Sequence, residues 1–290
     1  MRLGWIVLAH RGSAQVARLA RRLQAREDRT FLHIDKTIRL EPFAQALHSD
    51  RERVLLLPRR RSRWGTYGVL GATLDGMHAA LQCGCDYLLV ISGQDYPIKP
   101  IEALRDHLTA LEGASFILHW PLPAPDWSVP EGGLWRLNRR HYRFGRFHVH
   151  FPNRWTPFVA PREMPLGLWP YAGPNWWCLP REAARYVVSF LEANPEVIRF
   201  YRRAALPAES LFQTVLLNSP LRTRVVQDDL RYVVWKQGES HPETLDSSHL
   251  KTLALTPAFL ARKFDEQRDP GLLDLIDERL LGVSPLPATG

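Results

Sequence analysis

A glutamate stands two residues behind a proline at the predicted start of a helix. From Pro207 to Phe212 the sequence reads PAESLF. An acid in the first turn complements the helix dipole, and this structural role alone would explain Glu209. The functional alternative is a general base, because an attacking alcohol needs a carboxylate or a histidine to take its proton. Glu209 is therefore the candidate catalytic residue.

Two adjacent cations, Arg262 and Lys263, stand between apolar residues in the stretch FLARKF at 259–264. Such a pair is usually the solvated edge of a helix. It can also hold a diphosphate, because a guanidinium group forks onto phosphate oxygens and an ammonium group adds a point charge. A departing diphosphate needs its charge neutralised by cations or by a metal ion.

The alternative of a metal site has little support in the sequence. The chain contains no Asp-x-Asp, and the segment after a predicted strand reads ISGQDYPI at 91–98, with Asp95 as its single acid. One carboxylate is a poor magnesium site by itself. We therefore expect that no metal is required and that Arg262 and Lys263, the basic pair, neutralise the diphosphate instead.

The first third of the chain alternates apolar runs with helical periodicity, which predicts a Rossmann-like, mainly parallel α/β sheet flanked by helices. A Trp-, Pro-, Arg- and His-rich middle at 120–169 predicts short antiparallel strands and loops. The expected strands are 5–9, 30–34, 54–57, 87–91 and 115–118, and the expected helices are 14–24, 67–81, 101–111, 182–191 and 211–217, with a further helical region at 257–281.

Polar residues follow three of these strands directly. His10 comes after the first strand, Asp35 after the second, and Asp95 after the run at 87–91. Ligands of open α/β sheets bind beyond the carboxyl ends of the strands. The sequence therefore predicts a binding crevice at this edge.

The chain of 290 residues carries a formal net charge of +8. Such a surplus of positive charge attracts nucleotides, nucleic acids or an anionic membrane surface. It is also compatible with peripheral association of the protein with a membrane. A basic nucleic-acid-binding protein is thus the rival hypothesis, although the cations are scattered and form no recognised motif. Three cysteines are too few for a disulfide framework, and the first apolar run is too short to span a membrane, so we expect a cytoplasmic protein.

Seven segments, taken in their order along the chain, resemble glycosyltransferase family 14. This family contains the core 2/I-branching β-1,6-N-acetylglucosaminyltransferases and the peptide O-xylosyltransferases. Each segment is weak evidence alone, but their shared order along nearly the whole chain is specific. The segments are IVLAH at 6–10, FLHIDK at 31–36, RWG at 63–65, ISGQDYPI at 91–98, GPNWW at 173–177, PAESLF at 207–212 with Asn218 and Ser219, and ARKF at 261–264.

The resemblance implies a GT-A fold, a UDP-sugar donor, inversion at the anomeric carbon and no catalytic metal. It implies that Glu209 is the general base and that Arg262 and Lys263 hold the diphosphate. It also implies that Val7 and Asp35 frame the uridine, and that Trp64 and Asp95 line the donor pocket. His10 lies in the same crevice.

On the acceptor side, the resemblance favours Asn175, Trp176 and Trp177. The family often has an acid where this chain has Asn175, which puts its way of activating the acceptor in question. We expect one domain, with a nucleotide-binding half at about 1–118, an acceptor and catalytic half at about 119–281 and a tail at 282–290. The resemblance favours N-acetylglucosamine or xylose as the donor sugar and a glycan as the acceptor. A catalytically silent relative that only binds sugars is the remaining alternative.

Overall fold

A computed structural model describes residues 1–125, 129–144, 147–151, 162–236, 239 and 241–286. For residues 143–144 and 147–151 it describes the backbone only. The side chains of His148 and His150 therefore lie outside the described part of the chain. No described helix combines the length and the apolarity that crossing a bilayer requires.

Seven described strands form the central sheet, in the order β12-β6-β11-β4-β1-β2-β3. The pairs among β1 to β4 are parallel, whereas β11 runs antiparallel between β4 and β6. This is the mainly parallel α/β sheet that the sequence predicts. Its strands are β1 (Leu3–Ala9), β2 (Arg29–Ile34), β3 (Val54–Leu56), β4 (Tyr87–Ser92), β6 (Ser115–Ile117), β11 (Trp177–Pro180) and β12 (Val225–Val226).

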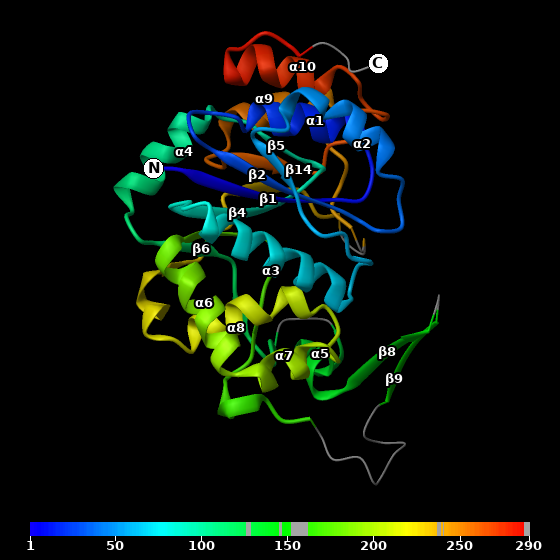
Figure 1. Cartoon of the computed structure of the whole chain (residues 1–290), viewed down its shortest axis with the longest axis vertical. Coiled ribbons are helices and arrows are strands. Elements are labelled where there is room, and N and C mark those ends of the chain that lie inside the picture. The colour runs from blue at the N-terminus through cyan, green and yellow to red at the C-terminus, as the bar shows by residue number, and fades with distance from the viewer. Residues whose placement is uncertain (126–128, 145–146, 152–161, 237–238, 240, 287–290) are drawn as a thin grey trace.

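Helices cover both faces of this sheet (Figure 1). Leu3, Trp5 and Val7 of β1 point into one core, which also contains residues of α1, α4 and α10. Ile6 points into the other core, with residues of α3, α6 and α8. The alternation follows from the period of two in a strand, and because both faces are covered the strand is apolar throughout. The helices are α1 (Ser13–Arg22), α2 (Glu41–Ala46), α3 (Tyr67–Gln82), α4 (Ile101–Ala110), α5 (Trp135–Asn138), α6 (Arg181–Ala193), α7 (Pro195–Tyr201), α8 (Leu211–Leu217), α9 (Leu250–Leu255) and α10 (Leu272–Ile276).

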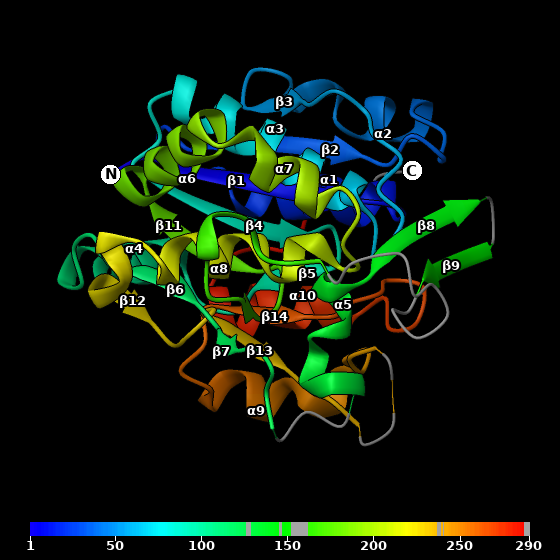
Figure 2. The ribbon, with the colours of Figure 1, turned by 90° about the horizontal axis from the view of Figure 1, so that it is seen from below.

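A second, three-stranded sheet has the order β13-β14-β5 and lies beside the first, as the view from below shows (Figure 2). It consists of β5 (Asp95–Pro97), β13 (Arg231–Val233) and β14 (Leu260–Arg262). The expectation of a helical region over 257–281 is wrong at its beginning, because Leu260 and Ala261 are fully buried by pairing with β5 and β13. Within residues 257–281, helical structure begins only at α10.

The middle of the chain forms two antiparallel ribbons, in agreement with the expectation of short strands. β7 (Trp120–Pro121) pairs with β10 (Tyr171–Ala172), and β8 (Arg140–Phe144) pairs with β9 (Phe147–Phe151). The β8–β9 hairpin projects from the body of the molecule (Figure 1).

Candidate active site

The small sheet places Arg262 directly opposite Asp95, because these residues are register partners in the β14–β5 pair. Arg262 Nε lies 3.3 Å from Asp95 Oδ1, and Arg231 Nε lies 3.3 Å from Asp95 Oδ2. Asp95 is completely buried and also accepts hydrogen bonds from the amide and the hydroxyl of Ser92. Its carboxylate is therefore fully occupied by the protein and serves to fix two arginines.

Arg262 still has donors to spare. Its guanidinium carbon lies 4.2 Å from the centroid of the Trp176 ring, so the indole supports the group from one side. Among the described residues, neither Nη atom of Arg262 donates a hydrogen bond. Burial, together with the charge of Arg231, lowers the pKa of Arg262 below its ordinary value. A partly buried cation with unused donors is suited to an anionic ligand.

Lys263 follows Arg262 through a cis peptide bond. Among the described residues, no carboxylate lies within ion-pair distance of its Nζ. Burial and the neighbouring Arg262 and Arg11 lower the pKa of Lys263. Arg11, in contrast, is paired with Asp265. The ammonium group of Lys263 is thus available to a ligand.

Two buried glutamines hold the chain immediately after these cations. Gln15 Nε2, from α1, donates to the carbonyl oxygens of Gly93 and Phe264, each at 3.1 Å. Gln94 Nε2 donates to the same Phe264 oxygen at 3.2 Å, and the Phe264 amide donates to the Gln94 carbonyl. The segment is therefore fixed to α1 and to the β4–β5 turn, which keeps Lys263 in place.

His10 lies at the end of β1 and is exposed. Partial burial by its surroundings and the charge of Arg11 lower the pKa of its imidazole, with smaller effects of the same sign from Arg262 and Lys263, whereas Asp35 acts in the opposite direction. These electrostatic effects indicate that His10 lies near Asp35 and the basic pair.

Asp35 organises the loop beyond β3. Its Oδ1 accepts from the Thr37 amide and hydroxyl, and its Oδ2 accepts from the Ser62 amide and hydroxyl, at 2.5–2.7 Å. Burial alone would raise the pKa of Asp35, but these hydrogen bonds lower it to about 2. The carboxylate fixes the segment that leads to Trp64. Val7 is 1% exposed, so its side chain belongs to the core beneath the crevice.

Glu209 ends a short 3-10 turn, Pro207–Glu209, just before α8. Its side chain is partly exposed, with a relative accessibility of 26%, and Arg136 Nη1 of α5 donates to Oε2 at 3.1 Å. Burial raises the pKa of Glu209, while Arg136 and a hydrogen bond from the Trp64 indole oppose this rise. The site therefore holds a carboxylate that is accessible, oriented and more basic than usual.

The segment from Gly173 to Trp176 connects Glu209 with the basic pair. The Gly173 amide donates to the Glu209 carbonyl at 2.9 Å, and three residues later Trp176 stacks against Arg262. A side chain at Gly173 would meet the Leu118 carbonyl oxygen at 2.0 Å, so only glycine permits this approach. Asn175, which lies between Gly173 and Trp176 in the chain, is 9% exposed, and its Oδ1 accepts no hydrogen bond from a described residue.

One acceptor-side expectation, that for Trp177, needs correction, whereas that for Trp176 stays a prediction. Trp177 is completely buried in β11, with its ring centroid 5.0 Å from that of Phe212, so it cannot stack on a sugar. Trp176 contacts Arg231 and Arg262 and hence supports the basic pair. Trp64, by contrast, is 61% exposed beside Glu209. Sequence reasoning also missed Arg136 and Arg231, because a buried carboxylate signals that a cation is needed but not which one.

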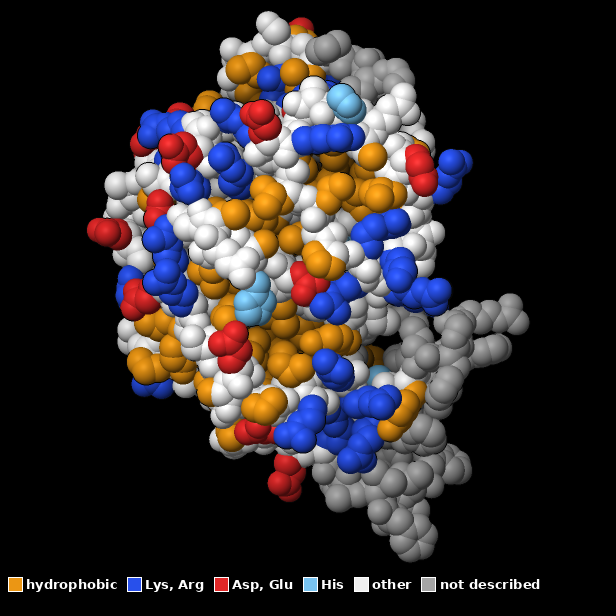
Figure 3. All heavy atoms as spheres, viewed as in Figure 1, with side chains coloured by type: hydrophobic (Ala, Val, Ile, Leu, Met, Phe, Trp, Pro, Cys, Tyr) orange, Lys and Arg blue, Asp and Glu red, His pale blue; other side chains and the backbone are white. Residues whose placement is uncertain are grey.

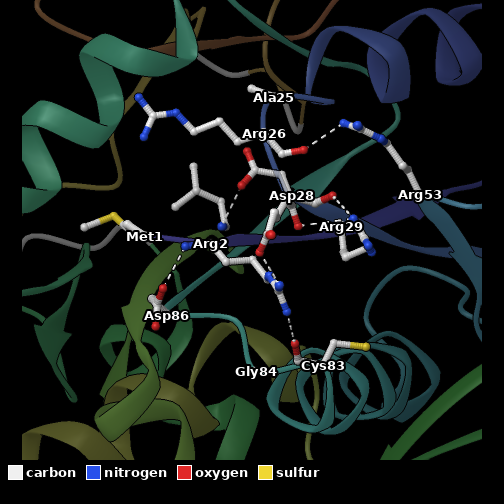
Figure 4. A network of polar contacts seen from close by, with 12 residues as sticks. Met1, Arg2, Ala25, Arg26, Asp28, Arg29, Arg53, Cys83, Gly84 and Asp86 are labelled. Atoms are coloured by element: carbon white, nitrogen blue, oxygen red, sulfur yellow. Dashed lines mark hydrogen bonds and ion pairs between the residues drawn. The ribbon is translucent and has the colours of Figure 1, made fainter.

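A hollow of about 370 Å³ lies at the opposite edge of the sheet, lined by Arg2, Arg26, Glu27 and Asp86 among others. Its polar groups bond to the protein itself (Figure 4). The Arg2 amide donates to Asp86 at 2.7 Å, and its Nη1 donates to the Cys83 carbonyl at 2.7 Å. The hollow thus offers few free groups, and it lies away from the edge at which such sheets bind ligands.

The chain belongs to the Core-2/I-Branching enzyme family, whose sequence profile matches residues 3–258. It is 26% identical to xylosyltransferase 2 of Rattus norvegicus over 309 residues, which is 98% of this chain and 34% of that protein. It is 25% identical to xylosyltransferase oxt of Drosophila melanogaster, over 96% of this chain and 33% of that protein. The chain therefore spans about a third of the length of the curated relatives it matches.

Solved structures with a similar arrangement include mouse xyloside xylosyltransferase 1, with a TM-score of 0.40, 11% identity, and coverage of 90% of this chain and 97% of that one. The galactosyltransferase LgtC, solved with donor and acceptor sugar analogues, has a TM-score of 0.38 and 10% identity, and covers 93% of this chain and 89% of its own. The GT-A type fold rests on the strand order described above and on family membership.

Proposed function

We propose that this chain is an inverting, metal-independent glycosyltransferase that moves a sugar from a UDP-sugar to a hydroxyl group of a glycan. The observation that carries the proposal is the unpaired state, among the described residues, of the Arg262 Nη atoms and Lys263 Nζ at the ligand-binding edge of the sheet. Two adjacent cations, one of them held by Asp95 through Nε with its Nη donors unused, fit the two phosphates of a nucleotide diphosphate. Membership of the Core-2/I-Branching family supports the same reaction class.

In this mechanism Glu209 accepts the proton of the acceptor hydroxyl as its oxygen attacks the anomeric carbon. The attack comes from the face opposite UDP, so the configuration is inverted. Arg262 and Lys263 stabilise the charge that develops on the departing diphosphate, which is the work a metal ion performs in other enzymes. On the acceptor side the proposal keeps Asn175, whose Oδ1 is buried and accepts no hydrogen bond from a described residue. The proposal places the reaction in the cytoplasm.

The direct test is release of UDP from a panel of UDP-sugars in the presence of EDTA, with water receiving the sugar when no acceptor is added. UDP-N-acetylglucosamine and UDP-xylose are the favoured donors, with UDP-glucose and UDP-galactose for comparison. We expect turnover with one favoured donor that is unchanged by EDTA. Activity that EDTA abolishes would refute metal independence, and salt-sensitive binding to nucleic acid without any response to UDP-sugars would favour the rival binding protein.

The pH dependence of turnover tests Glu209 through its neighbour. Burial raises the pKa of Glu209 above its ordinary value of 4.5, and Arg136 opposes this rise. Because the base works only when ionised, kcat should fall as the pH drops through this raised pKa. The Arg136→Gln variant removes the opposing charge. The acidic limb of its pH profile, where kcat falls with decreasing pH, should therefore lie at higher pH than that of the wild type.

The matched control is Arg139→Gln, since Arg139 belongs to the same segment but pairs with Glu131. Its acidic limb should coincide with that of the wild type in kcat measurements from about pH 4 to 8. If the limb of Arg136→Gln also stays in place, Glu209 is not the group that controls it.

A further inference from the structure

Exposed arginines lie on two segments next to the one that carries Glu209. Arg140 begins β8, and Arg202 and Arg203 follow α7. All three are exposed, and none has a carboxylate within ion-pair distance among the side chains that the structure describes. We call these three residues the basic belt.

Backbone hydrogen bonds fix the belt next to the base. The His141 amide donates to the Arg203 carbonyl at 2.9 Å, and the Ala205 amide donates to the Arg136 carbonyl at 2.9 Å. Residues 136–141 and 203–205 therefore run side by side, and the second segment leads into the turn that ends at Glu209. Arg136 itself contacts the Glu209 carboxylate. The belt thus lies on the acceptor side of the site.

Aromatic rings support two of the three arginines of the basic belt. The Arg203 guanidinium lies 4.6 Å from the Tyr142 ring centroid, and that of Arg202 lies 5.2 Å from the Tyr67 ring centroid. Burial and the charge of Arg140, with a further effect from Arg203, lower the pKa of Arg162 to about 10. Figure 3 shows Lys and Arg side chains gathered at the end of the molecule where Figure 1 places α7 and the base of the hairpin.

The sequence around the belt excludes negative charge. Residues 132–162 contain seven arginines and three histidines but no aspartate or glutamate. The whole chain has 30 acidic residues in 290, so about three would be expected in this stretch. A solvated surface ordinarily mixes both signs of charge. An anionic ligand explains the one-sided composition.

The exposed aromatic surface beside the base indicates the kind of anion. Trp64 is 61% exposed and hydrogen-bonds to Glu209, so a flat apolar ring adjoins the carboxylate that activates a hydroxyl. A tryptophan ring binds the apolar face of a sugar, and arginine forks bind carboxylates and phosphates. The two together fit a sugar chain with acidic groups.

We propose that the acceptor is an acidic oligosaccharide, whose carboxylate or phosphate groups bind the basic belt while one of its hydroxyls meets Glu209. This inference rests on the proposed function, since it assigns the acceptor of that same site. It concerns Arg140, Arg202 and Arg203, which the donor side does not use.

The test compares the full-length wild type with a belt variant, Arg140→Gln/Arg202→Gln/Arg203→Gln. The matched control is Arg51→Gln/Arg222→Gln/Arg279→Gln, which removes three exposed arginines from other parts of the surface and leaves the same net charge. The probes are oligogalacturonate for carboxylates, a phosphomannan oligomer for phosphates, a neutral dextran oligomer and a single-stranded oligonucleotide, each titrated near physiological salt. UDP affinity is measured for all three proteins.

We expect the wild type and the control to bind at least one acidic oligosaccharide and not the dextran. The belt variant should bind that acidic oligosaccharide at least tenfold more weakly, with unchanged UDP affinity. Whether oligogalacturonate or the phosphomannan oligomer shows this loss identifies the anionic group as carboxylate or phosphate. Equal losses in the belt and control variants, equal binding of dextran, failure of both acidic sugars, or preference for the oligonucleotide would each overturn the inference. If the wild type does not bind UDP, this result contradicts the proposed function instead. Failure of the acceptor inference and failure of the proposed function are therefore distinguishable.

Discussion

Replacement of Glu209 by glutamine is expected to lower kcat for sugar transfer by about 10²- to 10⁴-fold, the usual contribution of a general base. Glutamine preserves the shape of the side chain, and its carbonyl oxygen can still accept from Arg136 and Trp64. The fold and the donor site should therefore be unaffected. UDP affinity should stay within about twofold of the wild type, because the basic pair is unchanged.

The measurement is single-turnover transfer, with UDP titration on the same preparation. Glu182→Gln is the matched control, since Glu182 is an exposed carboxylate on α6 that pairs with Arg224. It should transfer sugar at the wild-type rate. Near-normal turnover by Glu209→Gln would remove Glu209 from the mechanism, and lost UDP binding in that variant would point to a structural role.

The second large effect is expected at Asp95. Replacing Asp95 by alanine leaves Arg231 and Arg262 without their shared carboxylate. Arg231 keeps the carbonyl oxygens of Val90 and Asp229 as acceptors, whereas Arg262 keeps none among the described residues. Uncompensated buried charge typically lowers the free energy of unfolding by about 3–5 kcal/mol. UDP affinity should also fall, because Arg262 is no longer held in position.

Denaturant unfolding checks this prediction, with Asp274→Ala as the control. Asp274 pairs with Arg18, but it is 46% exposed and Arg18 also pairs with Asp277. Its loss should therefore lower the free energy of unfolding by less than about 1 kcal/mol. If Asp95→Ala is destabilised no more than this control, Asp95 does not anchor the arginines.

Apolar patterning predicted the sheet well. The uninterrupted apolar run at 87–91 predicted a strand covered on both faces, and the structure shows β4 at the centre of the sheet. The polar residues that follow the strands lie at one edge of that sheet, and their role in binding a ligand stays a prediction. Asp35 and Lys263 both act electrostatically on the imidazole of His10, so the residues that follow β1 and β2 lie near the basic pair.

Local patterns failed where long-range pairing decides the structure. Leu260 and Ala261 resemble a helical segment, but they pair with β5, more than 160 residues earlier in the chain. Adjacent tryptophans in GPNWW have different roles, because successive residues of an extended segment point to opposite sides. Trp176 supports Arg262, and Trp177 fills the core.

The identity of ion-pair partners was also beyond sequence reasoning. Asp95 was expected to line the donor pocket, yet it is completely buried against two arginines. Its influence on the donor would pass through Arg262. Arg136 could not be assigned to Glu209 because 73 residues separate them and only the fold brings them together.

Thermal unfolding with and without UDP, in the presence of EDTA, tests the central claim most directly. A ligand at about a hundred times its dissociation constant stabilises the folded state by about 2.7 kcal/mol. We expect UDP to raise the Tm of the wild type by several degrees in EDTA and to leave that of Lys263→Ala almost unchanged. A wild-type Tm that does not respond to UDP, or that responds only without EDTA, would contradict the account of a diphosphate held by Arg262 and Lys263.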